Sequence, residues 1–107
     1  MPKLTIGKGT AMLYMVIELF KSGSRPVRDR FVGEGRMLPD GVRYLASWID
    51  PKVERCFQVI EADSEQLVQS WTNRWADLVD FEVVPVVTSQ EYWAAFDSSS
   101  EVTRPVS

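Results

Sequence analysis

Glu18 is the residue whose surroundings most favour chemistry. It interrupts the run from Met12 to Phe20, which is otherwise almost wholly apolar and rich in β-branched and aromatic side chains. A carboxylate buried in such a run needs a partner or takes a raised pKa. Two interpretations stay open. Glu18 is a general acid or base, or an anchor for a ligand hydroxyl; alternatively, it forms an ion pair with an arginine and has a structural role only.

Gln58 and Cys56 are the next candidates, because they lie two positions apart and a strand places both on one face. If that strand neighbours the run around Glu18, this face lies beside the carboxylate. Gln58 could then donate a hydrogen bond to a substrate oxygen; otherwise it is a satisfied amide at a subunit interface. Cys56 lacks a histidine to activate it as a nucleophile, so we expect a small, buried, apolar side chain.

Tyr44, Trp48 and Arg36 are candidates for ligand binding. The two aromatic residues could line a pocket and stack on a planar ligand, although aromatic residues in strands more often belong to the core. Arg36 could bind a carboxylate with both arms of its guanidinium, as could Arg55. The alternative for each arginine is an ion pair at the surface.

The sequence contains no histidine. This excludes Ser-His-Asp triads, Cys-His pairs, histidine-ligated metals and a histidine-ligated haem within one chain. No phosphate-binding loop, metal-ligand motif or dinucleotide fingerprint is present either, so we expect no cofactor and no metal. The net charge of −3 argues against unspecific nucleic-acid binding. No apolar run approaches the roughly 20 residues of a membrane span, and the single cysteine fits a cytoplasmic protein.

The elements that must position these residues follow the order β-α-β-β-α-β. One helix begins near Pro26, and a capping box formed by Asp63 and Gln66 predicts the start of the other. The order predicts an α+β fold of the ferredoxin-like kind, an antiparallel sheet with both helices on one face. Pro85 indicates an edge strand or a bulge. The expected strands are Met12 to Phe20, Val42 to Ile49, Val53 to Ala62 and Phe81 to Val87.

The body of the domain is expected to span residues 12–96. Residues 1–11 read as a flexible leader and the Ser-rich residues 97–107 as a disordered tail. Between them, Ser89 to Phe96 predicts a short helical turn whose aromatic residues pack against the body. The second helix is expected to place Trp71 and Trp75 in the core.

Apolar residues on both faces of the strands predict a homodimer. In the first strand Met15 and Ile17 lie on one face, and Tyr14 and Val16 lie on the other with Glu18. An uncovered sheet face should be polar, so we expect a second copy to cover it with two-fold symmetry. We assign Glu18 to this covered interior, and we expect Tyr44 and Trp48 to share one face of the second strand.

The sequence also resembles a family of small bacterial proteins catalogued as a domain of unknown function, type 3303, within the dimeric α/β-barrel superfamily. The resemblance covers Met12 to Val87, and its motifs are Met12 to Glu18, Gly35 to Gly41, Ser47-Trp48, Arg55 to Gln58, Trp71, Trp75 and Phe81 to Val86. It implies dimerisation through the sheet into an α/β barrel with a site inside. The family has no assigned activity, and its superfamily includes cofactor-free monooxygenases, polyketide cyclases, isomerases and haem-using enzymes.

Two functions are therefore expected. The first is a dimer that binds a small, mostly apolar or aromatic metabolite in the barrel interior, as a cofactor-independent isomerase, cyclase or monooxygenase with Glu18 as acid or base. The second is a non-catalytic ligand-binding or protein-interaction module whose barrel interior is packed. A solvent-accessible cavity of roughly 300 Å³ or more beside Glu18 would favour the first.

Overall fold

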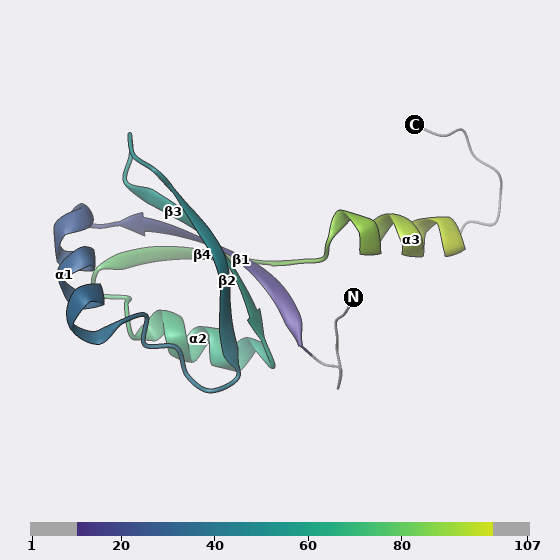
Figure 1. Cartoon of the computed structure of the whole chain (residues 1–107), viewed down its shortest axis with the longest axis horizontal. Helices are drawn as coiled ribbons and strands as arrows, with labels where there is room; N and C mark the ends of the chain where they lie inside the picture. Colours follow the sequence, from purple (N-terminus) through teal and green to yellow (C-terminus); the bar gives the residue numbers. More distant parts are fainter. Residues whose placement is uncertain (1–10, 100–107) are drawn as a thin grey trace.

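The computed structural model describes residues 11–99 and has an α+β fold with the predicted element order through its fourth strand. A third helix follows, and Figure 1 shows the whole arrangement. The elements are β1 (Met12–Phe20), α1 (Ser24–Glu34), β2 (Val42–Asp50), β3 (Arg55–Ala62), α2 (Glu65–Asn73), β4 (Val79–Val86) and α3 (Ser89–Ser99).

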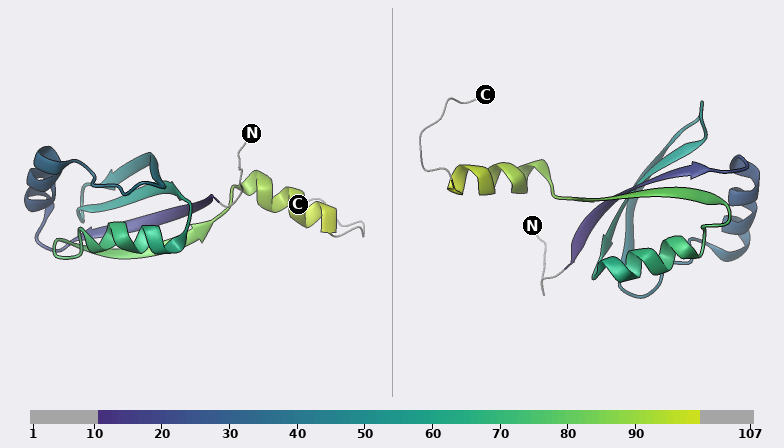
Figure 2. Two further views of the ribbon diagram at one scale, coloured as in Figure 1. Left: turned by 90° about the horizontal axis from the view of Figure 1, so that it is seen from below. Right: turned by 180° about the vertical axis from the view of Figure 1, so that it is seen from behind.

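The four strands form one antiparallel sheet in the order β2-β3-β1-β4. The long apolar strand β1 is therefore central, with hydrogen-bonded neighbours on both sides. Pro85 lies in the edge strand β4, as its missing N–H requires. Both α1 and α2 contribute to the core on one face of the sheet, and Figure 2 shows them from two further sides.

The core is made of alternate strand residues and the apolar stripe of α2. Tyr14 and Val16 of β1 are buried against Val68 and Trp71 of α2, and Phe31 of α1 packs on the same cluster. Burying one such aliphatic side chain stabilises the fold by about 2 kcal/mol. This packing fixes which face of β1 lies beneath the helices.

A β-bulge in β2 changes which of its side chains point to each face of the sheet. The register with β3 shifts between Tyr44 and Ala46, so Leu45 is an extra residue. Tyr44 and Ser47 pair with residues of the helix-covered face, whereas Trp48 pairs with Phe57 on the opposite face. The prediction that Tyr44 and Trp48 share a face is wrong, because the inserted residue reverses the order of faces after Tyr44.

The cap of α2 differs from the predicted one, whereas α1 begins close to Pro26 as predicted. α2 is capped by Ser64, whose hydroxyl accepts a hydrogen bond from the Leu67 N–H, while the predicted cap Asp63 forms an ion pair with Arg43. At α1, the carboxylate of Glu54 accepts hydrogen bonds from the Ser24 N–H and hydroxyl, both at 2.7 Å. The β2–β3 turn, residues 51–54, thus caps α1 from across the fold.

The helix α3 extends away from the sheet beyond the end of β4 (Figure 1). Tyr92 and Trp93 are half-exposed and their rings contact each other at 5.0 Å. The expectation that these aromatic residues pack against the body was wrong. Residues 97–99 continue the helix, whereas the rest of the expected tail and residues 1–10 lie outside the described residues. Within residues 11–99 no helix is long and apolar enough to cross a membrane.

Candidate functional site

Glu18 lies on the helix-covered face of the sheet. It shares this face with Tyr14 and Val16 and is only 8% exposed. Its assignment to an interior between two sheets was wrong. Both faces of β1 are apolar in the sequence, so alternation groups Glu18 with Tyr14 and Val16 without saying which face the helices cover.

Gln58 and Cys56 lie beside Glu18, as the strand spacing predicted. Cys56 is the register partner of Glu18 across β1 and β3, and Gln58 is two residues further along β3. The Gln58 Nε2 donates a hydrogen bond of 2.6 Å to the Glu18 Oε2. Both side chains are buried, so the bond is shielded from water.

Arg36 completes a chain of three polar side chains. Its Nε donates to the Gln58 Oε1 at 2.8 Å, and Gln58 in turn donates to Glu18. The arginine N–H needs an acceptor, so it turns the amide oxygen toward Arg36 and the amide nitrogen toward the carboxylate. Within residues 11–99, Glu18 itself forms no ion pair, and its Oε1 has no hydrogen-bond partner.

Burial controls the proton affinity of Glu18. Desolvation raises its pKa from the usual 4.5 to about 7, although the Gln58 hydrogen bond and the charge of Arg36 act in the opposite direction. A carboxyl group with this pKa populates both protonation states near neutral pH. Such a group can accept or donate a proton under the same conditions.

Cys56 is buried, as expected, and unsuited to nucleophilic chemistry. Burial, with a smaller contribution from the nearby Glu18, raises the pKa of its thiol to about 12. The thiol therefore stays protonated at neutral pH, and the thiolate is the reactive form.

Two tryptophans hold the backbone of Arg36. The indole N–H groups of Trp71 and Trp75 both donate to the Arg36 carbonyl oxygen at 2.9 Å. Arg74 donates to the next carbonyl, that of Met37, at 2.7 Å. Trp71 and Trp75 are core residues as predicted, but their helical spacing carries no sign of this second role.

Tyr44 contributes to the site through Arg36, whereas Trp48 does not. The Arg36 guanidinium carbon lies 3.6 Å from the centre of the Tyr44 ring, and the Tyr44 hydroxyl is 2.8 Å from the Ser47 hydroxyl. Trp48 is 60% exposed on the opposite face. The bulge in β2 therefore removes Trp48 from the candidate site.

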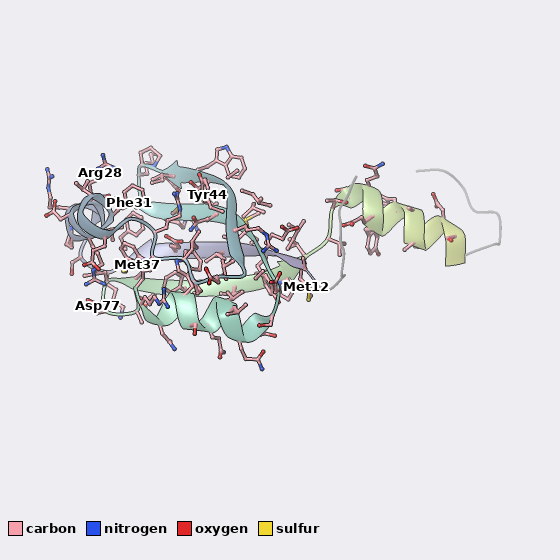
Figure 3. All side chains as sticks on the ribbon, turned by 60° about the horizontal axis from the view of Figure 1, so that its bottom comes forward. Met12, Arg28, Phe31, Met37, Tyr44 and Asp77 are labelled. Atoms are coloured by element: carbon pink, nitrogen blue, oxygen red, sulfur yellow. The ribbon has the colours of Figure 1, made fainter. Side chains whose placement is uncertain are left out.

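A cavity of about 270 Å³, open to solvent, lies over Glu18 between the sheet face, α1 and α2. Its lining is mainly apolar, and its volume is close to the lower end for small-molecule sites, about 300 Å³. Figure 3 labels Arg28 and Phe31 on α1, which contribute to the lining, and Tyr44 on β2. The lining residues are Glu18, Phe20, Ser24, Val27, Arg28, Phe31, Arg36, Ser47, Ile49, Cys56, Gln58, Trp71 and Trp75.

Sequence reasoning missed the contribution of α1 to this site. Val27 and Phe31 are four residues apart, as on one apolar face of a helix, and this spacing does not indicate a cavity wall. For a metal there is no support: the described part of the chain has no group of three or more Cys, Asp or Glu residues able to hold an ion.

A family model matches residues 12–99, and its description is Domain of unknown function (DUF3303). The chain belongs to this family. Comparisons with curated proteins and with solved structures find no match. In this DUF3303 domain, Glu18, Arg36 and Gln58 all lie inside the matched segment. The same segment includes α3, which the expected body of the domain left out in part.

Proposed function

We propose that this protein binds a small, mostly apolar metabolite in the cavity between the sheet and its helices. Glu18 transfers a proton to or from the bound molecule without a cofactor. One observation carries this proposal: a buried carboxyl group, with a pKa of about 7, lines an open and mainly apolar cavity. The site is thus beneath the helices and not in an interior between two sheets.

The chemistry that fits this arrangement is proton abstraction next to a carbonyl group. The Glu18 carboxylate takes a proton from the carbon, the electron pair moves to the carbonyl oxygen to give an enolate, and the protonated Glu18 returns the proton at a second position. Isomerisations and cyclisations follow this pattern. The Oε1 atom, which has no hydrogen-bond partner among residues 11–99, supplies the lone pair, and Gln58 holds Oε2 in place.

Exchange of carbon-bound protons tests this proposal without knowledge of the natural substrate. Phenylacetone in D₂O is the probe, and NMR follows the loss of its α-protons. We expect the wild-type protein to accelerate exchange roughly 100-fold or more over Glu18→Gln, the usual contribution of a positioned base. Glu34→Gln, an exposed carboxylate on α1, is the matched control and should exchange as the wild type does. Equal rates for wild type and Glu18→Gln would contradict the proposal.

The uncovered sheet face supports a further proposal, a homodimer formed through that face. Leu19 and Trp48 are 46% and 60% exposed there, and Met15, Ile17 and Val59 of the two central strands lie on the same side. A contiguous apolar face of this kind marks an interaction surface, and two-fold pairing with a second copy is the commonest way to cover it. This face also favours the second candidate function, a non-catalytic interaction module.

A further inference from the structure

Within residues 11–99, Arg36 is a cation held in place by hydrogen bonds but without an acidic partner in an ion pair. The ion pairs of the described residues involve Lys21, Arg25, Arg30, Arg43 and Arg55, but not Arg36. Its carbonyl is held by two indole groups and its Nε by Gln58. An ordinary surface arginine is flexible because it lacks such hydrogen bonds. The Arg36 side chain is therefore positioned before any ligand binds.

The free part of the Arg36 side chain is the edge formed by its two terminal nitrogens. Tyr44 lies against the guanidinium at 3.6 Å, and Phe31 lies 5.3 Å away. Neither terminal nitrogen has a hydrogen-bond acceptor among residues 11–99. Two parallel N–H donors in one plane match the two oxygens of a carboxylate.

The charges around the cavity also favour an anion. Arg28 lines the same cavity from α1, 5.8 Å from the Phe31 ring, and it too lacks an ion-pair partner in the described part of the chain. Among the described residues, Glu18 is the one acidic side chain that contributes to the lining. Two guanidinium groups face one carboxyl group, so an incoming anion is attracted even when Glu18 is ionised.

We propose that the ligand of this cavity is an apolar carboxylic acid. Its carboxylate binds the terminal nitrogens of Arg36, and its aromatic or branched aliphatic body occupies the lining between Phe31, Trp71 and Glu18. This proposal rests on the proposed function, because it concerns the same cavity, and it makes Arg36 the residue that selects the ligand. A phosphate would need more donors than this single planar edge and its apolar surroundings provide.

A matched pair of probes tests the charge requirement: 3-phenylpropionate and 3-phenylpropionamide have the same body and differ in the anion. Binding is followed by quenching of tryptophan fluorescence, since Trp71 and Trp75 line the cavity, and by titration calorimetry. We expect the wild type to bind the carboxylate roughly tenfold to 100-fold more tightly, as for hydrogen bonds to a charged group. Arg36→Gln should remove this preference and leave the affinity for the amide unchanged.

Controls separate ligand selection from a structural role. Arg43→Gln, an arginine of β2 that is ion-paired outside the cavity, should keep the wild-type preference. Arg36→Lys keeps the charge without the planar edge and should bind the carboxylate several-fold more weakly; it serves if Arg36→Gln does not fold.

Two results would overturn the assignment of a carboxylate. One is equal wild-type affinity for the two probes, with proton exchange by Glu18 intact; the cavity function then stands and the anion requirement fails. The other is an equal loss of affinity for both probes in Arg36→Gln, which would make Arg36 a support for Gln58 and nothing more. Absence of binding by both probes, together with absence of proton exchange, would overturn both proposals.

Discussion

Glu18 opposes folding at neutral pH, because its pKa is raised in the folded protein from 4.5 to about 7. Below about pH 4.5 the carboxyl is protonated in both the folded and the unfolded state, so its burial carries no penalty for a charge. Between about pH 4.5 and pH 7 the carboxyl of the unfolded chain is ionised and hydrated, whereas the folded site keeps it protonated. The free-energy penalty grows across this window and reaches up to roughly 3 kcal/mol.

Glu18→Gln should therefore stabilise the protein at high pH. The amide has a similar shape, stays neutral, and can still accept the hydrogen bond from Gln58. We expect thermal unfolding curves that coincide near pH 4.5 and diverge toward pH 9, with the variant more stable by on the order of 2 kcal/mol. Glu34→Gln, an exposed carboxylate, is the control and should show no such divergence. A variant that is less stable at pH 9 would show that Glu18 is ionised and stabilised in the fold.

Cys56 should resist alkylation in the folded protein. Its side chain is buried and its thiol pKa is raised to about 12, so the thiolate population at pH 8 is very small. Iodoacetamide at pH 8 should label the native protein far more slowly than the protein in urea, as mass spectrometry can follow. Equal labelling rates in the two states would mean that the β1–β3 face opens readily.

At the level of single residues, the sequence predicted which side chains lie beside Glu18 but not on which face of the sheet they lie. Alternation on β3 placed Gln58 and Cys56 on one face, and the antiparallel register brought that face beside Glu18. The sequence did not indicate which face of the sheet Glu18 occupies, because β1 is apolar on both faces. Arg36 was selected for its chemistry alone; the two indole hydrogen bonds that position it depend on tertiary packing.

Among the elements, the connection into β2 depends on Gly41. Its φ of +92° is one that side chains with a Cβ rarely adopt, and an added Cβ would lie 2.7 Å from the Leu67 Cδ1 and 3.2 Å from the Asp63 Oδ2. The Leu67 methyl can move, so the backbone strain is the larger penalty. We expect Gly41→Ala to lower the free energy of unfolding by about 1–2 kcal/mol in urea denaturation.

Gly33→Ala is the matched substitution with the opposite sign. Gly33 lies near the end of α1, has no positive φ, and an added Cβ would have nothing within 4 Å. Alanine there should raise the free energy of unfolding by about 0.5–1 kcal/mol, because it reduces the freedom of the unfolded chain. A loss of stability in Gly33→Ala would indicate that α1 tolerates no added side chain near its end.

Element order was predictable and element ends were not. Hydrophobic periodicity and the Pro-Asp-Gly turn at residues 39–41 sufficed for β-α-β-β-α-β. The cap of α2 is Ser64 and not the predicted Asp63, because Asp63 forms an ion pair with Arg43 of the neighbouring strand β2. The bulge at Leu45 leaves no local signature, and it alone decides that Tyr44 and not Trp48 reaches Arg36.

For the whole molecule, the two apolar faces of β1 lie in different surroundings. Tyr14 and Val16 are buried by the helices within one chain. Met15 and Ile17 lie on the other face, which no helix of the described chain covers (Figure 2). An antiparallel sheet with one open face normally alternates apolar and polar residues, and this strand does not. The excess of apolar residues is accounted for if a second copy covers them.

Met15→Lys tests the proposed dimer at the centre of that face. Met15 pairs with Val59 on one side and Val84 on the other, so a lysine there has no carboxylate beside it in register. In a monomer the lysine would extend into water at little energetic expense, whereas in a dimer it would be an unpaired buried charge costing several kcal/mol.

We expect sedimentation equilibrium at micromolar concentration to find a dimer for the wild type and a monomer for Met15→Lys. Val32→Lys, a substitution at a 68% exposed position of α1, should remain dimeric. A wild-type monomer would refute assembly through the sheet, and a dimeric Met15→Lys would place the contact elsewhere, with the projecting α3 as the next surface to alter.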